Sequence, residues 1–385
     1  MSTIKVNKIE NTATADGGIS IDSSGHVQID GAQLPTTGQL SNRNLLYNGA
    51  ATVYQRGENA SISANASNFA TDRWQLEVDD AGTWTFSQST DTPSGFGYSH
   101  KLDCTTAKSS LDSDSVLIFQ QYLEGQDLQH LDKGSSGAKN LTLSFYVKSA
   151  KTGTHVVEFQ DKDNNRNCQR SYTISAADTW ELKTLTIPGD TTGALDNDNG
   201  HSLSVRFWLA AGSIFTSGTL QTDWGSTVNA NRVVGQVNLA DDTSNNWLVT
   251  GIQLEIGEKA TPFEHRSFGD ELARCQRYFR RFCEGVQYAS APSSGYGVSS
   301  TSAYHNVDLS PEMRSVPTLA DFSNLRTDDV SGGQAITALS LVSSMSSTEA
   351  VFLNATSASG LTQYRPYALL ANNTTGAKLD LSAEL

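Results

Sequence analysis

Seven histidines are the side chains of this sequence best suited to metal binding or proton transfer, and their spacing supports neither role. No two lie at the HxxxH or HxH spacing of a zinc pair, and the chain has no GxSxG, P-loop or GxGxxG segment. Carboxylates are plentiful, so a glycosidase pair stays open from the sequence alone. We expect a chain without enzymatic activity. The histidines are His26, His100, His130, His155, His201, His265 and His305.

Two acidic segments have the composition of cation-binding loops. Asp161-Lys-Asp-Asn-Asn165 begins like a calcium loop but lacks the glycine at position six and the glutamate at position twelve of an EF-hand. Asp196-Asn-Asp-Asn-Gly200 could gather oxygens around Ca²⁺, although Asn, Asp and Gly are first of all turn residues. Calcium therefore stays open, and we expect neither a metal site nor a cofactor.

The four cysteines are too few for a disulfide scaffold in a chain of this length, and none has CxxC spacing. Cys275 and Cys283 are expected to share a helix, about 12 Å apart at ~1.5 Å per residue, which is too far for a bond. We interpret Cys104, Cys168, Cys275 and Cys283 as buried free thiols made in a reducing compartment.

Composition and charge exclude several classes of protein. The 385 residues carry 27 Lys and Arg against 41 Asp and Glu, a net charge of −14, which makes nucleic acid a poor partner. No stretch approaches 18 consecutive apolar residues, so no membrane insertion is expected. The opening MSTIKVNKIE lacks an apolar core, so no secretion signal is expected. Abundant Ser, Thr, Asn and Gly favour short strands and polar turns.

Apolar and polar residues alternate along most of the chain, which is the pattern of antiparallel strands with one packed face. Many short strands of this kind predict a jelly-roll β-sandwich over 41–266 and a smaller β-domain over 285–385, so the expected fold class is all-β. The clearest runs are 74–78, 83–86, 141–147, 203–209 and 252–256, then 304–309, 318–322, 335–342, 350–353 and 364–370.

The first forty residues differ from the rest. Ile19 and Ile21, then Val27 and Ile29, alternate with polar residues on either side of a glycine-containing turn, which predicts a hairpin. A hairpin of this size is marginal in water. We therefore expect 1–40 to be a β segment for attachment to another protein or for trimerisation; a disordered tail is the alternative.

One helix is predicted over 267–284, linking the two β-domains. Ser267 and Asp270 have the spacing of a capping box, and Gly285 is placed to end the helix. Three arginines are expected on the face opposite its apolar residues. We interpret them as a clamp to a neighbouring domain or subunit; a solvent-facing stripe and an anion site are alternatives. The three are Arg274, Arg277 and Arg281.

Several of these segments resemble the β-sandwich modules of bacteriophage tail fibre proteins. The most specific similarity is to their "G-QLE-G", "ATPFE-R" and "EL-RCQRY" segments, in Gly251-Ile-Gln-Leu-Glu-Ile-Gly257, Ala260-Thr-Pro-Phe-Glu-His-Arg266 and Glu271-Leu-Ala-Arg-Cys-Gln-Arg-Tyr278. Weaker similarities are in Asn44-Leu-Leu-Tyr-Asn48-Gly49, Val53-Tyr-Gln-Arg-Gly57, Thr71-Asp-Arg-Trp74, Met313-Arg-Ser-Val-Pro-Thr318 and Ala383-Glu-Leu385. The opening Ser2-Thr-Ile-Lys-Val-Asn7 is similar to the first strand of marine podovirus fibre and appendage proteins.

The resemblance implies a carbohydrate-binding jelly roll in a homotrimeric virion protein, assembled in the host cytoplasm, that adsorbs the phage to host surface glycans. Residues 1–40 would join it to other tail or head proteins. The chain has no long shaft, so a short fibre, an adaptor-borne receptor-binding protein and a head fibre are all compatible with it. The alternative function is that of a head fibre, decoration or tail-junction protein without a receptor. A polysaccharide depolymerase is less expected, because tailspike hydrolases usually have long β-helical repeats, which the sequence lacks.

The aromatic residues indicate where a glycan would bind under that interpretation, since sugar C–H faces pack on aromatic rings. Trp208 is out of phase with the apolar residues of 203–209 and lies beside Arg206, and Trp224 lies in a turn-rich stretch. We therefore predict Trp208, Arg206 and Trp224 as glycan-binding residues; packing against a neighbouring domain or subunit is the alternative. The other tryptophans are expected in packing positions: Trp74, Trp84, Trp180 and Trp247.

Overall fold

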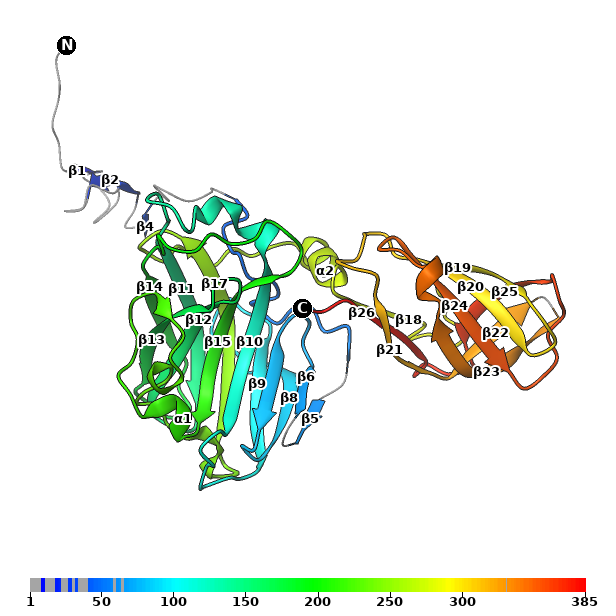
Figure 1. Cartoon of the computed structure of the whole chain (residues 1–385), viewed down its shortest axis with the longest axis horizontal. Coiled ribbons are helices and arrows are strands. Elements are labelled where there is room, and N and C mark those ends of the chain that lie inside the picture. Colours follow the sequence, from blue (N-terminus) through cyan, green and yellow to red (C-terminus); the bar gives the residue numbers. More distant parts are fainter. Residues whose placement is uncertain are drawn as a thin grey trace, which may run out of the picture. The chain divides into compact units, whose positions relative to one another are not determined.

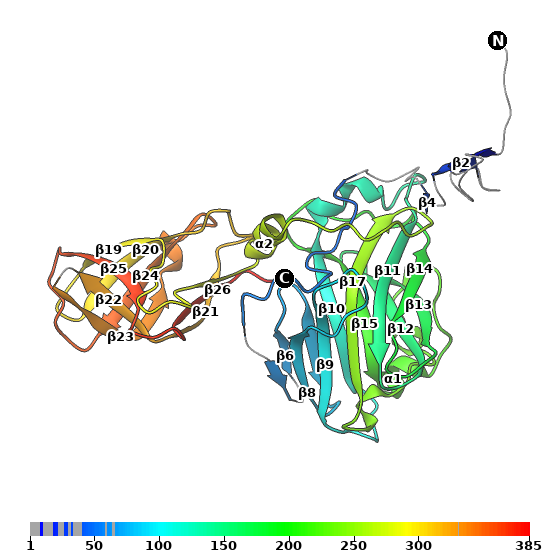
Figure 2. The same cartoon turned by 180° about the vertical axis from the view of Figure 1, so that it is seen from behind.

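The computed structural model describes residues 8–10, 18–21, 27–29, 32–33, 41–57, 60–63, 66–329 and 331–385. The chain forms two compact units, Met1–Thr52 with Glu58–Arg266, and Val53–Gly57 with Ser267–Leu385. Both consist mainly of antiparallel strands (Figures 1 and 2), which confirms the predicted all-β class. Among the described residues, no helix is long and apolar enough to cross a membrane.

Two antiparallel sheets form the sandwich of the first unit (Figure 1). The seven-stranded sheet consists, in spatial order, of β16 (Gly225–Ser226), β13 (Arg166–Ile174), β12 (Gly153–Asp161), β15 (His201–Ala211), β10 (Val116–Glu124), β7 (Gln75–Asp79) and β6 (Ala66–Phe69). The six-stranded sheet consists of β14 (Glu181–Ile187), β11 (Leu141–Ser149), β17 (Asn246–Ile256), β9 (Ser99–Thr106), β8 (Thr83–Ser89) and β5 (Ala60–Ile62).

Aromatic rings from both sheets meet in the core of the sandwich. Phe119 of β10 lies 5.5 Å from Trp247 of β17, and Phe207 of β15 lies 5.1 Å from Phe145 of β11, measured between ring centroids. All four side chains are fully buried. Because side chains alternate along a strand, the residues between these rings point to the outer faces of the sheets.

One long connection covers part of the outer face of the seven-stranded sheet. This covering segment, residues 212–237, contains α1 (Ser213–Thr216) and η2 (Asn229–Asn231). Its Phe215 and Val233 pack with Ile118 and Trp208 from the sheet. The other short helices of the first unit are η1 (Gly125–Leu131) and η3 (Leu239–Asp241).

The second unit combines a six-stranded barrel with a three-stranded sheet. Sequence alternation predicts a β-domain here, but it reveals neither β19 nor β22 nor the closure of the barrel. The barrel strands, in spatial order, are β19 (Ser293–Gly297), β20 (Ser302–Asp308), β24 (Ala350–Ser357), β23 (Gly332–Leu341), β22 (Leu325–Asp329) and β25 (Pro366–Ala371). The small sheet contains β18 (Phe279–Phe282), β26 (Lys378–Ser382) and β21 (Thr318–Ser323), and η4 is Ser343–Met345.

The linking helix is shorter than the sequence indicates. Helix α2 (Phe268–Gln276) begins at the predicted cap, where the Ser267 hydroxyl accepts a hydrogen bond from the Asp270 amide at 3.2 Å. The predicted end at 284 is wrong, because residues 279–282 form β18 and pair with β26 at the C-terminus. Pairing with β26 and burial of Phe279 override the local helical pattern. Cys275 and Cys283 therefore do not share a helix, and all four cysteines are free and buried.

The N-terminal residues that the structure describes form a separate small sheet, which contains the predicted hairpin. Ile19 pairs with Ile29 and Ile21 with Val27. The sheet contains β1 (Lys8–Glu10), β2 (Gly18–Ile21), β3 (Val27–Ile29) and β4 (Ala32–Gln33). The predicted first strand around residues 2–7 lies outside the described residues.

Candidate functional site

Polar side chains from four neighbouring strands form a band on the outer face of the seven-stranded sheet. They project from β7, β10, β15 and β12, at positions that alternate with buried core residues. Most are half-buried, so they are partly accessible yet held in place. The polar cluster consists of Gln75, Glu77, Gln120, Tyr122, Gln160 and Arg206.

Arg206 lies at the centre of the polar cluster and links three strands. Its Nε donates to Gln120 Oε1 at 2.8 Å, and its Nη1 donates to Gln160 Oε1 at 3.1 Å. Its Nη2 lies 3.5 Å from Glu77 Oε2. Within the described residues, the amide NH₂ of Gln160 donates no hydrogen bond, so it is available to a ligand oxygen.

The amide nitrogen of Gln120 has more acceptors around it than it has hydrogens. Its Nε2 lies 2.8 Å from Gln75 Oε1, 2.9 Å from Glu77 Oε2 and 2.7 Å from Tyr122 Oη. A side-chain amide has two N–H donors, so it satisfies two of these oxygens at a time. Since Tyr122 Oη also donates to Gln75 Oε1 at 3.2 Å, the amide can serve Glu77 and Tyr122, and within the described residues Glu77 Oε1 accepts no hydrogen bond.

Tyr122 and His201 form an aromatic platform at the edge of the polar cluster. Their ring centroids are 4.3 Å apart and the planes are inclined by 34°. Burial raises the pKa of Tyr122. Burial, together with the nearby charges of Lys162 and Arg206, lowers the pKa of His201 to about 4. Both rings are therefore uncharged near neutral pH.

The hydroxyl of Ser204 is buried on the same face of the sheet. Ser204 pairs with Tyr122 on β10 and with Gln160 on β12. Its Oγ is buried and has no hydrogen-bond partner among the described residues. Ser204 is 0% exposed, so this unpartnered hydroxyl costs free energy without being in reach of a ligand.

A buried ion pair fixes the covering segment next to the polar cluster. Glu158 of β12 accepts hydrogen bonds from Arg232 Nε at 2.8 Å and Arg232 Nη2 at 2.7 Å. Trp208 Nε1 donates to the same carboxylate at 3.0 Å. Burial would raise the pKa of Glu158, but the charges of Arg232 and Arg206 outweigh it and hold the pKa below its usual value. Glu158 is therefore ionised and acts as the anchor of the segment.

The structure corrects the role predicted for Trp208. The side chain points outward from β15, as its phase indicates, but it is only 1% exposed. Phe215 of the covering segment packs on it at 5.3 Å, so no ring face is free for a sugar. Its out-of-phase position therefore marks a contact with a covering loop, which the sequence pattern alone does not distinguish from a ligand contact.

Trp224 lies apart from Arg206 on the same sheet. It directly precedes β16, which lies three strands from β15. Its Nε1 donates to the Pro188 carbonyl at 2.8 Å, and Lys133 Nζ lies 5.4 Å from the ring centroid. Of the three predicted glycan residues, only Arg206 belongs to the polar cluster.

The predicted arginine clamp is divided between elements, because the helix ends at Gln276. Arg274 lies on α2, Arg277 follows it, and Arg281 lies on β18. Arg281 forms a bidentate pair with Asp380 at 2.8 and 2.7 Å and donates to the carbonyl of Arg56. Arg281 thus fastens the C-terminal strand and Val53–Gly57 within the second unit.

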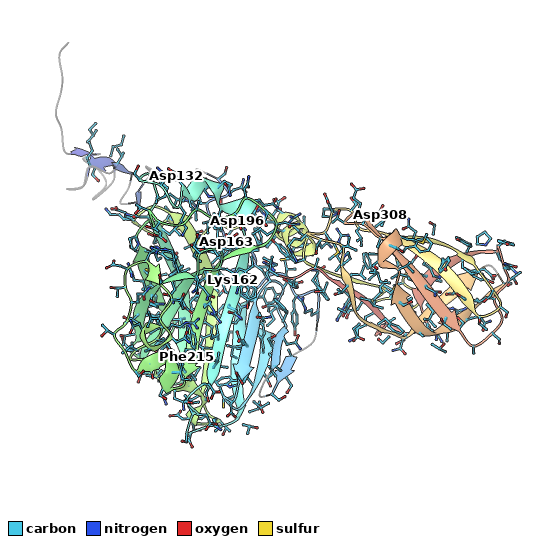
Figure 3. The ribbon with its side chains drawn as sticks, in the orientation of Figure 1. Asp132, Lys162, Asp163, Asp196, Phe215 and Asp308 are labelled. Atoms are coloured by element: carbon cyan, nitrogen blue, oxygen red, sulfur yellow. The ribbon has the colours of Figure 1, made fainter. Side chains whose placement is uncertain are left out.

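The two acidic loops are tied to each other. The Asp196 amide donates to Asp163 Oδ2 at 3.0 Å, and Figure 3 shows the two residues close together near one end of the sandwich, with Phe215 near the other. The Lys133 ammonium contacts Asp161, Asp190 and two backbone carbonyls beside these loops. Among the described residues, no group of three or more His, Cys, Asp or Glu is arranged to hold a metal ion.

Five of the six residues of the polar cluster could not be predicted as site residues from the sequence, because they are common polar residues. A weak signal exists in β10, where Gln120, Gln121 and Tyr122 interrupt an apolar run. Gln121 points inward and holds Tyr47, whereas Gln120 and Tyr122 point outward. Only the pairing of β10 with β7 and β15 brings these two beside Gln75, Glu77 and Arg206.

No family model matches the chain, and no curated protein matches it. Among solved structures, the enzymatically active domain of bacteriophage CBA120 tailspike protein 4 is 14% identical, with a TM-score of 0.29; the match covers 56% of this chain and 21% of that one. The family 11 carbohydrate-binding module of a Clostridium thermocellum cellulosomal cellulase is 13% identical, with a TM-score of 0.28, covering 53% and 97%. The C-terminal family 22 carbohydrate-binding module of another Clostridium thermocellum protein is 14% identical, with a TM-score of 0.26, covering 52% and 98%.

Proposed function

We propose that this chain is a bacteriophage virion appendage, a tail fibre or receptor-binding protein that adsorbs the particle to host surface glycans as a homotrimer. The polar cluster is the observation that supports glycan binding, and the sequence resemblance supports the virion setting. Residues 1–40 would connect the chain to other virion proteins. Antibody labelling of intact particles separates a tail appendage from a head fibre or decoration protein.

The polar cluster offers what a sugar ring needs for recognition. A sugar has C–H faces that pack on uncharged rings and hydroxyls that both donate and accept hydrogen bonds. The Tyr122–His201 platform provides the first contact. The amide of Gln160 and the carboxylate of Glu77 provide the second. Because these groups already hold one another in place, little conformational entropy is lost on binding.

The buried carboxylate of Glu158, next to the polar cluster, favours binding over hydrolysis. A glycosidase needs a carboxylic acid whose pKa is raised so that it can protonate the leaving group. The pKa of Glu158 is lowered, and this carboxylate is fully buried beneath Arg232 and Trp208. We therefore propose a binding protein without enzymatic activity.

Changing the polar cluster is expected to weaken glycan binding. The double variant Gln160→Ala/Tyr122→Ala removes one free donor and half of the aromatic platform, a loss of about 1.5–3 kcal/mol. That corresponds to at least tenfold weaker binding. A glycan array identifies the ligand for the full chain, and titration calorimetry then gives the affinity of each variant.

A matched control distinguishes this effect from a general loss of structure. Thr184→Ala changes an exposed polar residue on β14, in the other sheet, and should bind like the unaltered chain. If the double variant also binds normally while remaining folded by circular dichroism, the polar cluster is not the glycan site.

The homotrimer is supported by an apolar face of the N-terminal sheet. Ile9 pairs with Ile19, and Ile9, Ile19 and Ile21 are 59%, 43% and 45% exposed. Ile19→Asp is expected to convert the trimer to monomers, because a charge would be buried at the contact. Light scattering after size exclusion measures the mass. Ser20→Asp, next to it on the opposite face, should leave a trimer; a monomeric unaltered chain would contradict the proposal.

A further inference from the structure

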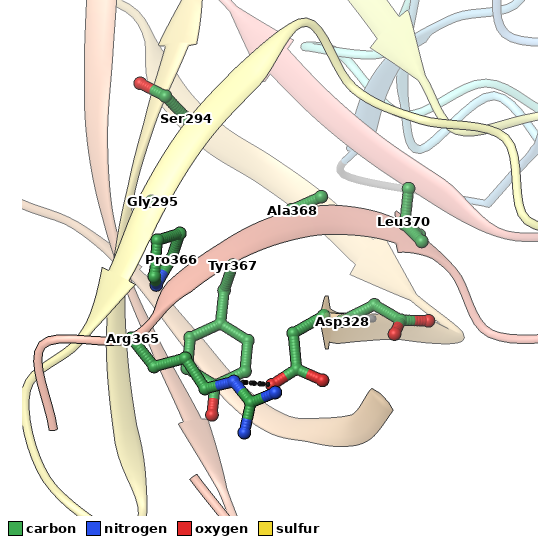
Figure 4. Close-up of a pocket in the computed structure, with 9 residues that line it drawn as sticks. Ser294, Gly295, Asp328, Arg365, Pro366, Tyr367, Ala368 and Leu370 are labelled. Carbon is green, nitrogen blue, oxygen red and sulfur yellow. Dashed lines mark ion pairs between the residues drawn. The ribbon is translucent and has the colours of Figure 1, made fainter. Parts of the chain in front are cut away.

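The barrel of the second unit carries a groove on its outer surface that is separate from the polar cluster. The groove has a volume of about 770 Å³ (Figure 4). Its floor is formed by alternate residues of β25, namely Pro366, Ala368 and Leu370. Leu369 and Ala371, between and beyond them, point inward and are buried. The floor is therefore apolar, and the volume falls in the range of roughly 300–1,000 Å³ typical of small-ligand sites.

The charges around the groove are neutralised within the barrel. Arg365 Nε lies 2.6 Å from Asp329 Oδ2, the ion pair drawn as a dashed line from Arg365 beside Tyr367 in Figure 4. Asp328 pairs with Arg326 at 2.9 Å. Each carboxylate thus has its own arginine, so a charged ligand would have to displace or oppose one member of a pair.

The rim also has unused hydrogen-bonding groups. Within the described residues, the Nη atoms of Arg365 and the hydroxyl of Ser294 make no hydrogen bond, and the Asp328 oxygen that faces away from Arg326 accepts none. These groups surround the apolar floor. A ligand that is polar at its edges and apolar on its face would satisfy both parts of the groove.

Exposed aromatic rings flank the groove. Tyr296 pairs with Pro366 across the β19–β25 ladder and is 44% exposed. Tyr364, one residue before Arg365, is 79% exposed. Large exposed rings beside a groove are typical of binding surfaces, because an aromatic face gives contact area at a low cost in conformational entropy.

We propose that this groove is a second binding site, specific for an uncharged saccharide. The C–H face of a sugar ring packs on Pro366, Ala368 and Leu370, and its hydroxyls bond Arg365, Ser294 and Asp328. The volume accepts a short oligosaccharide rather than a single ring. With two sites on one chain, each weak contact would raise the effective concentration at the other.

The test compares variants of the full chain on an array of neutral and acidic oligosaccharides. Ala368→Arg fills the floor of the groove, and Arg365→Met removes the free donors at its rim while leaving the floor intact. Both are made in the Gln160→Ala/Tyr122→Ala background, so that the polar cluster does not contribute. Ala338→Arg, at an exposed position of β23, is the matched control. Calorimetry with the best neutral hit gives the affinities.

We expect the background variant to retain binding to at least one neutral glycan. Ala368→Arg and Arg365→Met should each weaken that binding at least tenfold, and Ala338→Arg should change it less than twofold. No glycan bound by the background variant, a preference for acidic glycans, or full binding by folded Ala368→Arg would each overturn the proposal. If Gln160→Ala/Tyr122→Ala binds as tightly as the unaltered chain, and binding is lost only when Ala368→Arg or Arg365→Met is added, the polar cluster is refuted as a glycan site and the groove is supported.

Discussion

Arg232→Met is expected to lower the free energy of unfolding of the first unit by about 3–5 kcal/mol. The substitution preserves most of the volume of the side chain but leaves Glu158 buried without its bidentate partner. Arg206, with its Nη1 at 3.6 Å from the same carboxylate, compensates only in part. Urea unfolding followed by tryptophan fluorescence measures the loss. Hydrogen exchange should rise most in residues 212–237, because Arg232 fastens this covering segment.

The double variant Glu158→Gln/Arg232→Met identifies the cause of that loss. If the cost comes from an unpaired buried charge, neutralising Glu158 should recover part of the stability lost in Arg232→Met. If the cost comes from lost packing alone, the double variant should be at least as unstable as the single one. That second outcome would contradict the interpretation of Glu158 as a charged anchor.

The difference in the free energy of unfolding between the unaltered chain and Arg232→Met should depend on pH, because it arises from the ionised carboxylate of Glu158. A carboxylate whose pKa is lowered on folding stabilises the protein above its usual pKa of about 4.5, and this contribution is lost as the pH falls through the lower folded value. In Arg232→Met, burial outweighs the remaining charge and raises the pKa of Glu158, so the variant gains stability relative to the unaltered chain as the pH falls. The difference between the two proteins should therefore be smaller at pH 4 than at pH 7.

The strands could be predicted from the sequence because their cause is local. Alternation at 203–209 follows directly from one buried face, and β15 lies there. The end of α2 could not be predicted, because Phe279 and Phe282 suit a helical face as well as a strand. What decides between the two is β26, almost 100 residues later. Barrel closure depends on the same kind of distant pairing, between β19 and β25.

The candidate site was harder to predict than the fold. Arg206 is visible as a charge in an apolar strand, but its partners Gln120 and Gln160 resemble ordinary surface residues in the sequence. For Trp208 the sequence predicts too much. Its strand phase correctly indicates that the side chain points outward, but the ring is buried by a connection that begins four residues later. Strand phase predicts the face on which a side chain lies, whereas accessibility is set by loops whose paths carry no periodic signal.

Lys133→Ala is expected to destabilise the first unit by about 3–5 kcal/mol. The Lys133 ammonium is almost fully buried and contacts Asp161 and Asp190, the latter at 3.1 Å, as well as the carbonyl oxygens of Thr192 and Gly193 at 3.2 and 2.7 Å. Without it, Asp161 loses its only cationic contact among the described residues. Thermal unfolding measures the loss. Lys151→Ala, which breaks the more exposed pair with Asp241, is the control and should cost at most about 1 kcal/mol.

Added Ca²⁺ should restore part of the stability lost in Lys133→Ala and leave the unaltered chain unchanged. The ammonium occupies a position surrounded by two carboxylates and two carbonyls, which are the hard oxygen ligands that Ca²⁺ prefers. Arg166 also binds Asp190, at 2.8 and 2.9 Å, so the recovery should be partial. Removing the side chain vacates that position, and a cation that binds only the folded state stabilises it by mass action. Mg²⁺ should restore less, because it demands stricter octahedral geometry and gives up its water reluctantly. Equal recovery in Lys151→Ala would show a general effect of salt and contradict the expectation that Ca²⁺ binds at the position vacated by the Lys133 ammonium.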